Sequence, residues 1–338
     1  MTRKAYARAG VDLDLGNRLK GDIHRLVRQT HGPEVLGKIG GFGGLFAANF
    51  SGMREPVLVS SIDGVGTKLK IAFALHRHDT VGGDLVNHCI NDIAVLGARP
   101  LFFLDYIGAE KLEPRVFRKI LLGFSRACRA GGCALVGGET AQMPGMYRRG
   151  EYDLAGCIVG VVERACLIDG RRIQAGDQVL GLPSNGLHTN GYSLARKIFF
   201  AQLRLKPSAQ LAGLRLSLGE ELLRPHKNYQ PMLAQVPNEK LKGLAHITGG
   251  GLLDNLPRVL PDDCDAVIET TSWTVPPIFR LLQERGRVER TEMYQIFNMG
   301  IGMAAIVAPN DAAALAKQLR AKIIGRIERG HGLVSLSS

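Results

Sequence analysis

Short apolar runs and amphipathic stretches follow one another along this chain of 338 residues. Apolar runs bounded by turn residues predict buried strands, which we place at Pro56–Ile62, Leu101–Ile107, Cys133–Val136, Leu154–Val162, Val179–Leu182 and Ile301–Val307. Apolar residues at helical spacing predict helices, at Asp84–Leu96, Arg115–Ala130, Tyr192–Leu203, Gly251–Val259, Pro277–Arg285 and Ala312–Lys322. Strands and helices mix without regular alternation, so the predicted class is α/β or α+β, and a simple parallel doubly wound sheet is not favoured.

A polar, turn-rich stretch divides the pattern near its middle. It runs from Glu163 to Gly176, and the chain is long enough for two ordinary domains. We therefore predict an N-terminal domain over residues 1–165 and a C-terminal α/β domain over residues 175–338.

Composition narrows the possible partners. The net charge is +12, but the basic residues are dispersed and aromatic residues are 6% of the chain, so a solvated basic surface is favoured over nucleic-acid recognition. The longest apolar stretch, Leu154–Val162, is too short to span a bilayer, and the first residues lead into no signal-peptide core. The six cysteines include no C-x-x-C pair. These features predict a cytoplasmic protein with no nucleic-acid or membrane partner.

The segment Asp63-Gly64-Val65-Gly66-Thr67-Lys68 directly follows a predicted strand. Its glycines would let backbone N–H groups approach an anion, Lys68 adds a positive charge, and Asp63 is a suitable Mg²⁺ ligand. The spacing is not that of a Walker A motif. Phosphate binding and an ordinary turn both remain open at this point.

Two further carboxylates stand where a hard cation could bind. Asp92 lies in an apolar helical stretch, where an ionised carboxylate is costly unless paired or metal-bound. Glu139 follows a buried strand through Gly137 and Gly138 and precedes Thr140, a position suited to holding a cation. For each residue taken alone, a helix cap or a surface charge is the alternative.

Two polar, glycine-bounded segments stand out in the second half. In the segment 183–193, His188 could exchange protons with a reacting group near neutral pH, although a capping loop is the alternative. The segment His246–Gly251 precedes a predicted helix, whose backbone N–H groups would favour phosphate. A flexible loop without a ligand is the alternative there.

Together these segments resemble the phosphoribosylformylglycinamidine cyclo-ligase (aminoimidazole ribonucleotide synthetase) family. The matching stretches follow one another in family order from end to end, at Tyr6–Asp12, Gly40–Gly44, Asp63–Lys68, His78–Gly82, Pro100–Tyr106, Leu135–Tyr147, Gly186–Ser193, His246–Gly251 and Glu292–Asn298. Each motif is weak alone, but the ordered set is specific. The resemblance implies a two-domain homodimer whose N-terminal domains close a β-barrel, with active sites near the interface.

The resemblance also implies a reaction. ATP and Mg²⁺ would activate an amide oxygen of formylglycinamidine ribonucleotide through an iminophosphate. The imidazole ring would then close to give aminoimidazole ribonucleotide, ADP and phosphate, a step of purine biosynthesis.

Residue roles carry over from the same matching stretches. Candidates for ATP binding are Asp63, Gly64, Gly66, Thr67, Lys68, Asp92, Gly137, Gly138, Glu139 and Thr140, with Asp63, Asp92 and Glu139 as metal ligands. Catalytic candidates are His188, Asn190, Asp63 and Lys68. Candidates for the substrate or its phosphate are Gly43, Gly44, Ser193, Thr248, Gly249, Gly250 and Gly251. His246 is not among the metal ligands, because the family has histidine there where more distant relatives carry an acid.

The sequence departs from the family pattern at Gly83 and at Asn87-His88, where many members have apolar residues. Four other functions are weighed against the cyclo-ligase. A selenophosphate synthetase should carry an early reactive cysteine, and none precedes Cys89; a thiamine-phosphate kinase is the other enzyme of this kind. Only the net charge of +12 favours a nucleic-acid-binding protein. An inactive nucleotide-binding partner is disfavoured by the intact set of candidate residues.

Overall fold

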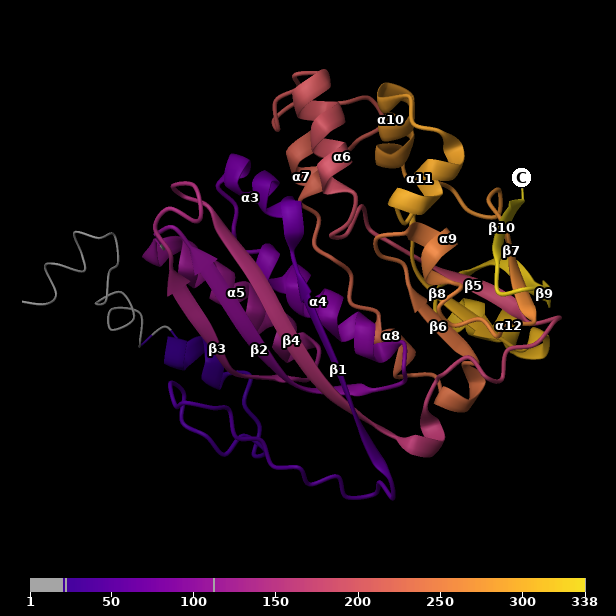
Figure 1. Ribbon diagram of the computed structural model, residues 1–338, viewed down its shortest axis with the longest axis horizontal. Coiled ribbons are helices and arrows are strands. Elements are labelled where there is room, and N and C mark those ends of the chain that lie inside the picture. The colour runs from indigo at the N-terminus through magenta and orange to yellow at the C-terminus, as the bar shows by residue number, and fades with distance from the viewer. Residues whose placement is uncertain (1–20, 22, 112, 338) are drawn as a thin grey trace, which may run out of the picture. The chain divides into compact units, whose positions relative to one another are not determined.

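The computed structural model describes residues 21–337 apart from residues 22 and 112, so the Tyr6–Asp12 motif lies outside the described residues. The chain divides into two compact units (Figure 1). One holds the residues up to Ile93 together with Pro100–Val161, and the other holds Ala94–Arg99 with Val162–Ser338.

The first unit is built on a sheet of four strands in the order β1-β4-β2-β3. In chain order they are β1 (Pro56–Gly64), β2 (Arg99–Ala109), β3 (Ala134–Gln142) and β4 (Tyr152–Glu163). β2 and β3 run parallel, with Asp105 opposite Gly138 and Tyr106 opposite Glu139. The order places β1 and β3 at the two edges of the sheet.

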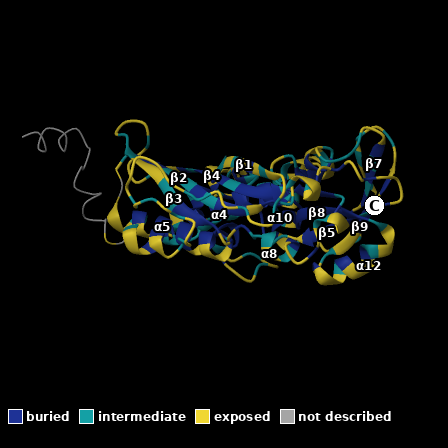
Figure 2. Ribbon diagram, turned by 90° about the horizontal axis from the view of Figure 1, so that it is seen from below, coloured by how far each residue is buried: buried dark blue, intermediate teal, exposed yellow. Residues whose placement is uncertain are grey.

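Two long helices, α4 (Val81–Ala94) and α5 (Pro114–Ala130), cover one face of this sheet (Figures 1 and 2). Their contact is close because both contribute a glycine: a Cβ on Gly82 would lie 2.4 Å from the carbonyl oxygen of Ile120, and one on Gly123 would lie 2.9 Å from that of Asp79. A short helical turn η1 (Gly66–Lys68) and helix α3 (Leu69–Leu75) lead from β1 toward α4. The tight packing fixes α4 beside the carboxyl end of β1.

The opposite face of the sheet carries apolar side chains that the described residues leave exposed. Along β1, residues alternate between inward and outward positions, and the outward Leu58 and Ile62 keep 62% and 73% of their surface exposed. The four strands form an open sheet within the described residues rather than a closed barrel. Large apolar side chains left exposed on one sheet face are typical of an interaction face.

The second unit holds a six-stranded mixed sheet in the order β10-β7-β9-β5-β8-β6. Its strands are β5 (Gln178–Pro183), β6 (Gly243–His246), β7 (Cys264–Glu269), β8 (Ile301–Val307), β9 (Lys322–Arg329) and β10 (Val334–Ser337). β5 pairs antiparallel with both β8 and β9, while β10 runs parallel to β7. β8 is buried along its whole length, as expected for an inner strand packed on both faces.

Helices and helical turns of the second unit connect these strands. They are α6 (Tyr192–Arg196), η3 (Lys197–Gln202), α7 (Leu218–Leu222), α8 (Gln230–Leu233), η4 (Asn238–Lys240), α9 (Gly251–Asn255), α10 (Pro277–Gly286), α11 (Arg290–Ile296) and α12 (Pro309–Gln318), and the turn η2 (Arg164–Cys166) follows β4. An apolar cluster that includes Leu180, Leu244, Met303 and Leu315 joins the sheet to α12. No helix in the described part of the chain has the length and apolar character needed to cross a bilayer.

The structure confirms the mixed α/β class and corrects several predicted bounds. β3 does not end at Val136 but continues to Gln142, so Glu139 lies within the strand rather than after it. The helix predicted to reach Val259 ends at Asn255. The helix predicted to reach Lys322 ends at Gln318, and β9 begins at Lys322.

Candidate active site

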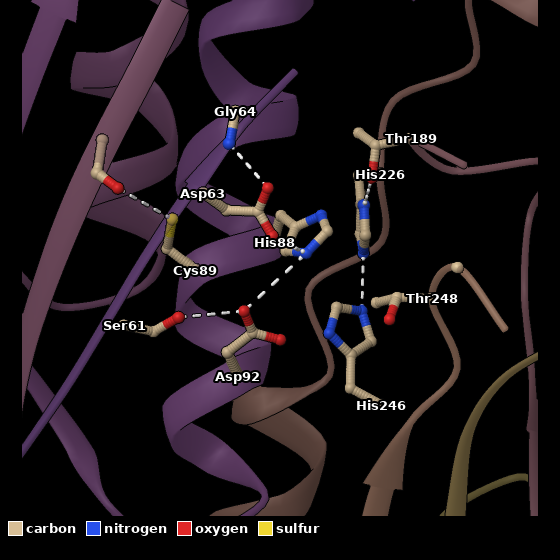
Figure 3. A network of polar contacts seen from close by, with 12 residues as sticks. Ser61, Asp63, Gly64, His88, Cys89, Asp92, Thr189, His226, His246 and Thr248 are labelled. Atoms are coloured by element: carbon tan, nitrogen blue, oxygen red, sulfur yellow. Dashed lines mark hydrogen bonds and ion pairs between the residues drawn. The ribbon is translucent and has the colours of Figure 1, made fainter. Parts of the chain in front are cut away.

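Asp63 is held at the carboxyl end of β1 by two hydrogen bonds. The backbone N–H of Gly64 donates to Oδ1 at 2.6 Å, and His88 Nε2 lies 2.7 Å from Oδ2 (Figure 3). Partial burial acts to raise the pKa of Asp63, but the hydrogen bond and charge of His88 outweigh it, so the pKa is lowered. Asp63 is therefore a fixed, ionised carboxylate with 39% of its side chain still exposed.

His88 links Asp63 to the second predicted carboxylate. On α4, Asp92 lies one turn beyond His88, with Oδ2 at 3.7 Å from Nε2, and it accepts a hydrogen bond of 3.0 Å from Ser61 Oγ on β1. Burial acts to lower the pKa of His88, yet the neighbouring carboxylates raise it overall, which favours the imidazolium. The structure thus brings Asp63 and Asp92 together around the buried His88 ring.

Lys68 points into the interior of the first unit. Its side chain is fully buried, and Nζ lies 2.9 Å from Asp84 Oδ2 on α4. Burial lowers the pKa of Lys68, and the Asp84 charge acts in the opposite direction. The ammonium group therefore ties the turn that precedes it to α4. That turn consists of Gly64 to Thr67.

Glu139 lies far from Asp63 within one chain. It is exposed on β3 together with Gly138 and Thr140, and β4 and β2 separate that strand from β1. Three strand spacings amount to about 14 Å, too far for both carboxylates to contact one ion. The structure therefore does not gather the three predicted metal ligands, Asp63, Asp92 and Glu139, in a single chain.

Asp105 is an additional titratable group beside the Gly137–Thr140 segment. It lies opposite Gly138, where a Cβ would come within 2.4 Å of Asp105 Oδ1, so only glycine leaves room for the carboxyl group. Burial raises the pKa of Asp105 to about 7. The predicted Gly43-Gly44 segment approaches the same strand, because a Cβ on Gly44 would lie 2.7 Å from Cγ2 of Val136.

In the second unit, the loop after β5 carries the predicted catalytic pair. His188 is buried and has a left-handed backbone with φ of 62°, which is uncommon for a non-glycine residue and concentrates at functional sites. Asn190 Nδ2 is buried and, among the described residues, meets no hydrogen-bond acceptor. A buried amide N–H group without an acceptor is well placed to donate a hydrogen bond to an oxygen atom of a bound ligand.

The Thr248–Gly251 loop is held to α9 by hydrogen bonds. The Asn255 side chain donates to the carbonyl oxygens of Gly249 and Gly251 at 3.1 and 2.8 Å. A Cβ on Gly249 would lie 3.3 Å from Asn190 Oδ1, so the loop and Asn190 adjoin. Ser193, by contrast, is exposed on α6 and lines a shallow hollow with Arg196 and Lys197.

Three residues of these sites were not predicted from sequence. His88 stood out only as a departure from the family pattern, and neither Asp84 nor His226 was singled out. Asp84, His88 and Asp92 recur at four-residue spacing, which places them on one helix face, and that spacing was the available signal for the first two. Nothing local in the sequence marks His226, which lies between α7 and α8 and whose Nδ1 lies 3.2 Å from Oγ1 of Thr189, the residue after His188.

Comparisons with known proteins agree with this architecture. Residues 49–162 match the family described as "AIR synthase related protein, N-terminal domain", and residues 174–336 match its C-terminal domain. The chain is therefore built from the two domains of the AIR synthase related proteins. Phosphoribosylformylglycinamidine cyclo-ligase of Geobacillus kaustophilus is 52% identical, with 98% of this chain and 97% of the relative covered. That of Syntrophotalea carbinolica is 50% identical, with 99% and 98% covered.

This chain belongs to the phosphoribosylformylglycinamidine cyclo-ligase family, and the prediction from its motifs is confirmed. Solved structures that share the fold include thiamine-monophosphate kinase from Stenotrophomonas maltophilia, with a TM-score of 0.67, 21% identity and coverage of 93% of this chain and 94% of that one. Hydrogenase maturation protein HypE in complex with ATP has a TM-score of 0.66, 18% identity and coverage of 95% and 90%.

Proposed function

We propose that this cyclo-ligase uses ATP and Mg²⁺ to close the imidazole ring of formylglycinamidine ribonucleotide in the cytoplasm. The products would be aminoimidazole ribonucleotide, ADP and phosphate. The observation that supports this best is the fixed carboxylate pair at the end of β1, in which Asp63 and Asp92 gather around His88. Family membership supports the choice of substrate.

The chemistry requires activation followed by positioning. An amide oxygen leaves poorly, and its phosphorylation gives an iminophosphate whose phosphate leaves readily. A nitrogen of the same molecule then attacks that carbon. Holding the two groups together makes closure effectively unimolecular, an advantage of up to about 7–11 kcal/mol. Phosphoryl transfer itself depends on positioning and charge neutralisation.

The donor set at the end of β1 suits Mg²⁺, which prefers carboxylate oxygens. We propose that Asp63 and Asp92 hold the ion, which would neutralise phosphate charge. The backbone N–H groups of the turn formed by Gly64, Gly66 and Thr67 would bind the nucleotide phosphates. Because Lys68 is paired with Asp84, we propose that it supports this turn from behind rather than contacting a phosphate. Gly137, Gly138, Glu139 and Thr140 would complete the ATP site.

We further propose that Glu139 reaches the site of a second copy. Both edges of the sheet, β1 and β3, are open to pairing in the described chain, and edge strands are natural points of association. Closure of two such sheets into a dimeric barrel would set β3 of one copy beside β1 of the other. The carboxylates that one chain keeps apart would then meet. The uncovered apolar face along β1 supports the same dimer.

This dimer predicts that Leu58→Asp yields monomers. Burial of the exposed Leu58 side chain would be replaced by burial of a charge, which is costly without a partner. Light scattering coupled to size-exclusion chromatography measures the mass. Leu333→Asp is the matched control, because Leu333 has the same 62% exposure but lies in the second unit. If the Leu58→Asp variant keeps the mass of a dimer, the face of the sheet around Leu58 is not part of the dimer interface.

In the second unit, we propose that the substrate is held by groups around the buried Asn190 amide. The adjoining Thr248, Gly249, Gly250 and Gly251 would hold the ribose phosphate, with Ser193 as a further candidate in this unit. Gly43 and Gly44 belong to the first unit and stay separate candidates for substrate contact. His188 would move or orient protons during ring closure, a role that imidazole fills near neutral pH. These roles follow the family resemblance and are consistent with the location of each residue within its own unit.

Substrate-dependent release of ADP tests the proposal. With Mg²⁺–ATP, we expect ADP release on addition of formylglycinamidine ribonucleotide and none with thiamine monophosphate. The second acceptor is included because a thiamine-monophosphate kinase shares the fold. ADP release with thiamine monophosphate alone would identify a kinase instead.

A further inference from the structure

Three buried histidines converge in the second unit, within one compact body. His188 follows β5, His226 lies between α7 and α8, and His246 ends β6. Their side chains are 1%, 1% and 6% exposed. One ring nitrogen from each lies within 4.8 Å of the others. Each buried imidazole needs partners for its polar nitrogens, and the three rings lie close enough to share one.

His226 and His246 face one another through their Nε2 atoms, which lie 3.0 Å apart (Figure 3). Their ring centroids are 5.1 Å apart and the planes are inclined by 60°. Two imidazoles on one tetrahedral Zn²⁺ have nitrogens about 3.3 Å apart, since each Zn–N bond is about 2.0–2.1 Å. The pair therefore already has nearly the separation that a shared ion requires.

Thr189 sets the orientation of the His226 ring. Its Oγ1 lies 3.2 Å from His226 Nδ1, on the side of the ring opposite His246. When Nδ1 donates its proton to this hydroxyl, Nε2 accepts the hydrogen bond from His246 Nε2, and a bound metal ion would take the place of that shared proton. Metal-binding histidines are usually fixed in this way by a polar partner on the other nitrogen.

His188 is placed to supply the third nitrogen. Its ring stacks on His226, with centroids 4.2 Å apart and planes inclined by 25°, so rotation of the ring off this stack would turn a nitrogen toward the pair. Space for the ring exists because position 302 is glycine, where a Cβ would lie 2.5 Å from His188 Cε1.

We propose that His188, His226 and His246 form a binding site for a transition-metal ion of the Zn²⁺ class. Three neutral imidazoles and an open fourth position are the ligand set of catalytic zinc sites, and imidazole selects Zn²⁺, Co²⁺ or Ni²⁺ over hard cations. This site goes beyond the proposed function and differs from the carboxylate site suggested for Mg²⁺. An ion here would bind an oxygen ligand at the open position beside the His188 loop.

Titration of the chelator-treated full-length protein with Co²⁺ tests the site. We expect one equivalent to bind with the visible absorption of tetrahedral cobalt, Zn²⁺ to displace it, and a large excess of Mg²⁺ to leave it in place. His188→Ala, His226→Gln and His246→Gln should each abolish the absorption. Thr189→Val should weaken binding by roughly 10–100-fold. His331→Gln, in an exposed loop, is the control and should bind as wild type does.

Circular dichroism confirms that each variant is folded before the titration is read. Failure of the folded wild type to bind one equivalent of Co²⁺ would overturn the proposal. So would full binding by any one of the three folded histidine variants. Either result would leave the three histidines as a hydrogen-bonded packing cluster. Neither result would bear on ADP release, so the cyclo-ligase proposal is tested separately.

Discussion

A heterodimer of two inactive variants, Asp63→Asn in one copy and Glu139→Gln in the other, is expected to recover roughly half of the wild-type activity per dimer. The reason is that β1 and β3 are opposite edges of one sheet. If Glu139 completes the site that Asp63 of the other copy begins, one site of the mixed dimer has both carboxylates. Each homodimer should lose activity by roughly 10²–10³-fold, the usual effect of removing a group that stabilises transition-state charge.

Co-expression with two affinity tags isolates the mixed dimer for this measurement. The matched control pairs Asp63→Asn with Asp92→Asn. These residues meet around His88 in the same chain, so each site of that dimer lacks one carboxylate and the activity should stay low. Equal inactivity of both mixed dimers would show that Glu139 does not act across the interface.

Asp84→Asn is expected to reduce the free energy of unfolding by about 3–5 kcal/mol. The substitution leaves Lys68, which is fully buried, without its carboxylate partner. Urea unfolding at fixed protein concentration, followed by circular dichroism, measures the change. A nearby pair provides the control: Lys70 and Glu151 lie 2.5 Å apart but keep 35% and 24% of their side chains exposed. Glu151→Gln should therefore cost about 1 kcal/mol or less.

A double variant separates charge burial from packing. Lys68→Met with Asp84→Leu replaces the buried pair by apolar side chains of similar size, and such replacements are often neutral. We expect it to be more stable than Asp84→Asn alone. An Asp84→Asn variant as stable as Glu151→Gln would contradict the buried ion pair.

Sequence patterns predicted β1 to β5, β8 and the long helices because their periodicity is decided locally. β8 and α5 were placed within one or two residues. β6, β7, β9 and β10 were missed. β9 and β10 are partly exposed, with mixed burial, and only their pairing partners make them strands. The Gly137–Thr140 segment was interpreted as a loop because two adjacent glycines usually end a strand. Here Gly138 instead makes room for Asp105 across the parallel pair.

The candidate sites were predictable in their residues but not in their distances. Family order identified Asp63, Asp92 and Glu139 together, yet sequence says nothing about which edge of a sheet a strand occupies. The strand order β1-β4-β2-β3 separates Glu139 from the other two. His226 and His246 are brought together by folding of the second unit, and no local spacing foretells such a meeting. Their roles, like those of the other site residues, stay predictions.

Formation of the aminoimidazole ring is the measurement that tests the central claim most directly. The full-length protein is incubated with formylglycinamidine ribonucleotide and Mg²⁺–ATP, and the product is detected by diazotisation. We predict a diazotisable aminoimidazole in amounts equal to the ADP released, and its near-complete loss in the folded Asp63→Asn variant. A folded wild-type protein that forms neither the aminoimidazole nor substrate-dependent ADP would contradict the assignment of ring closure to this chain.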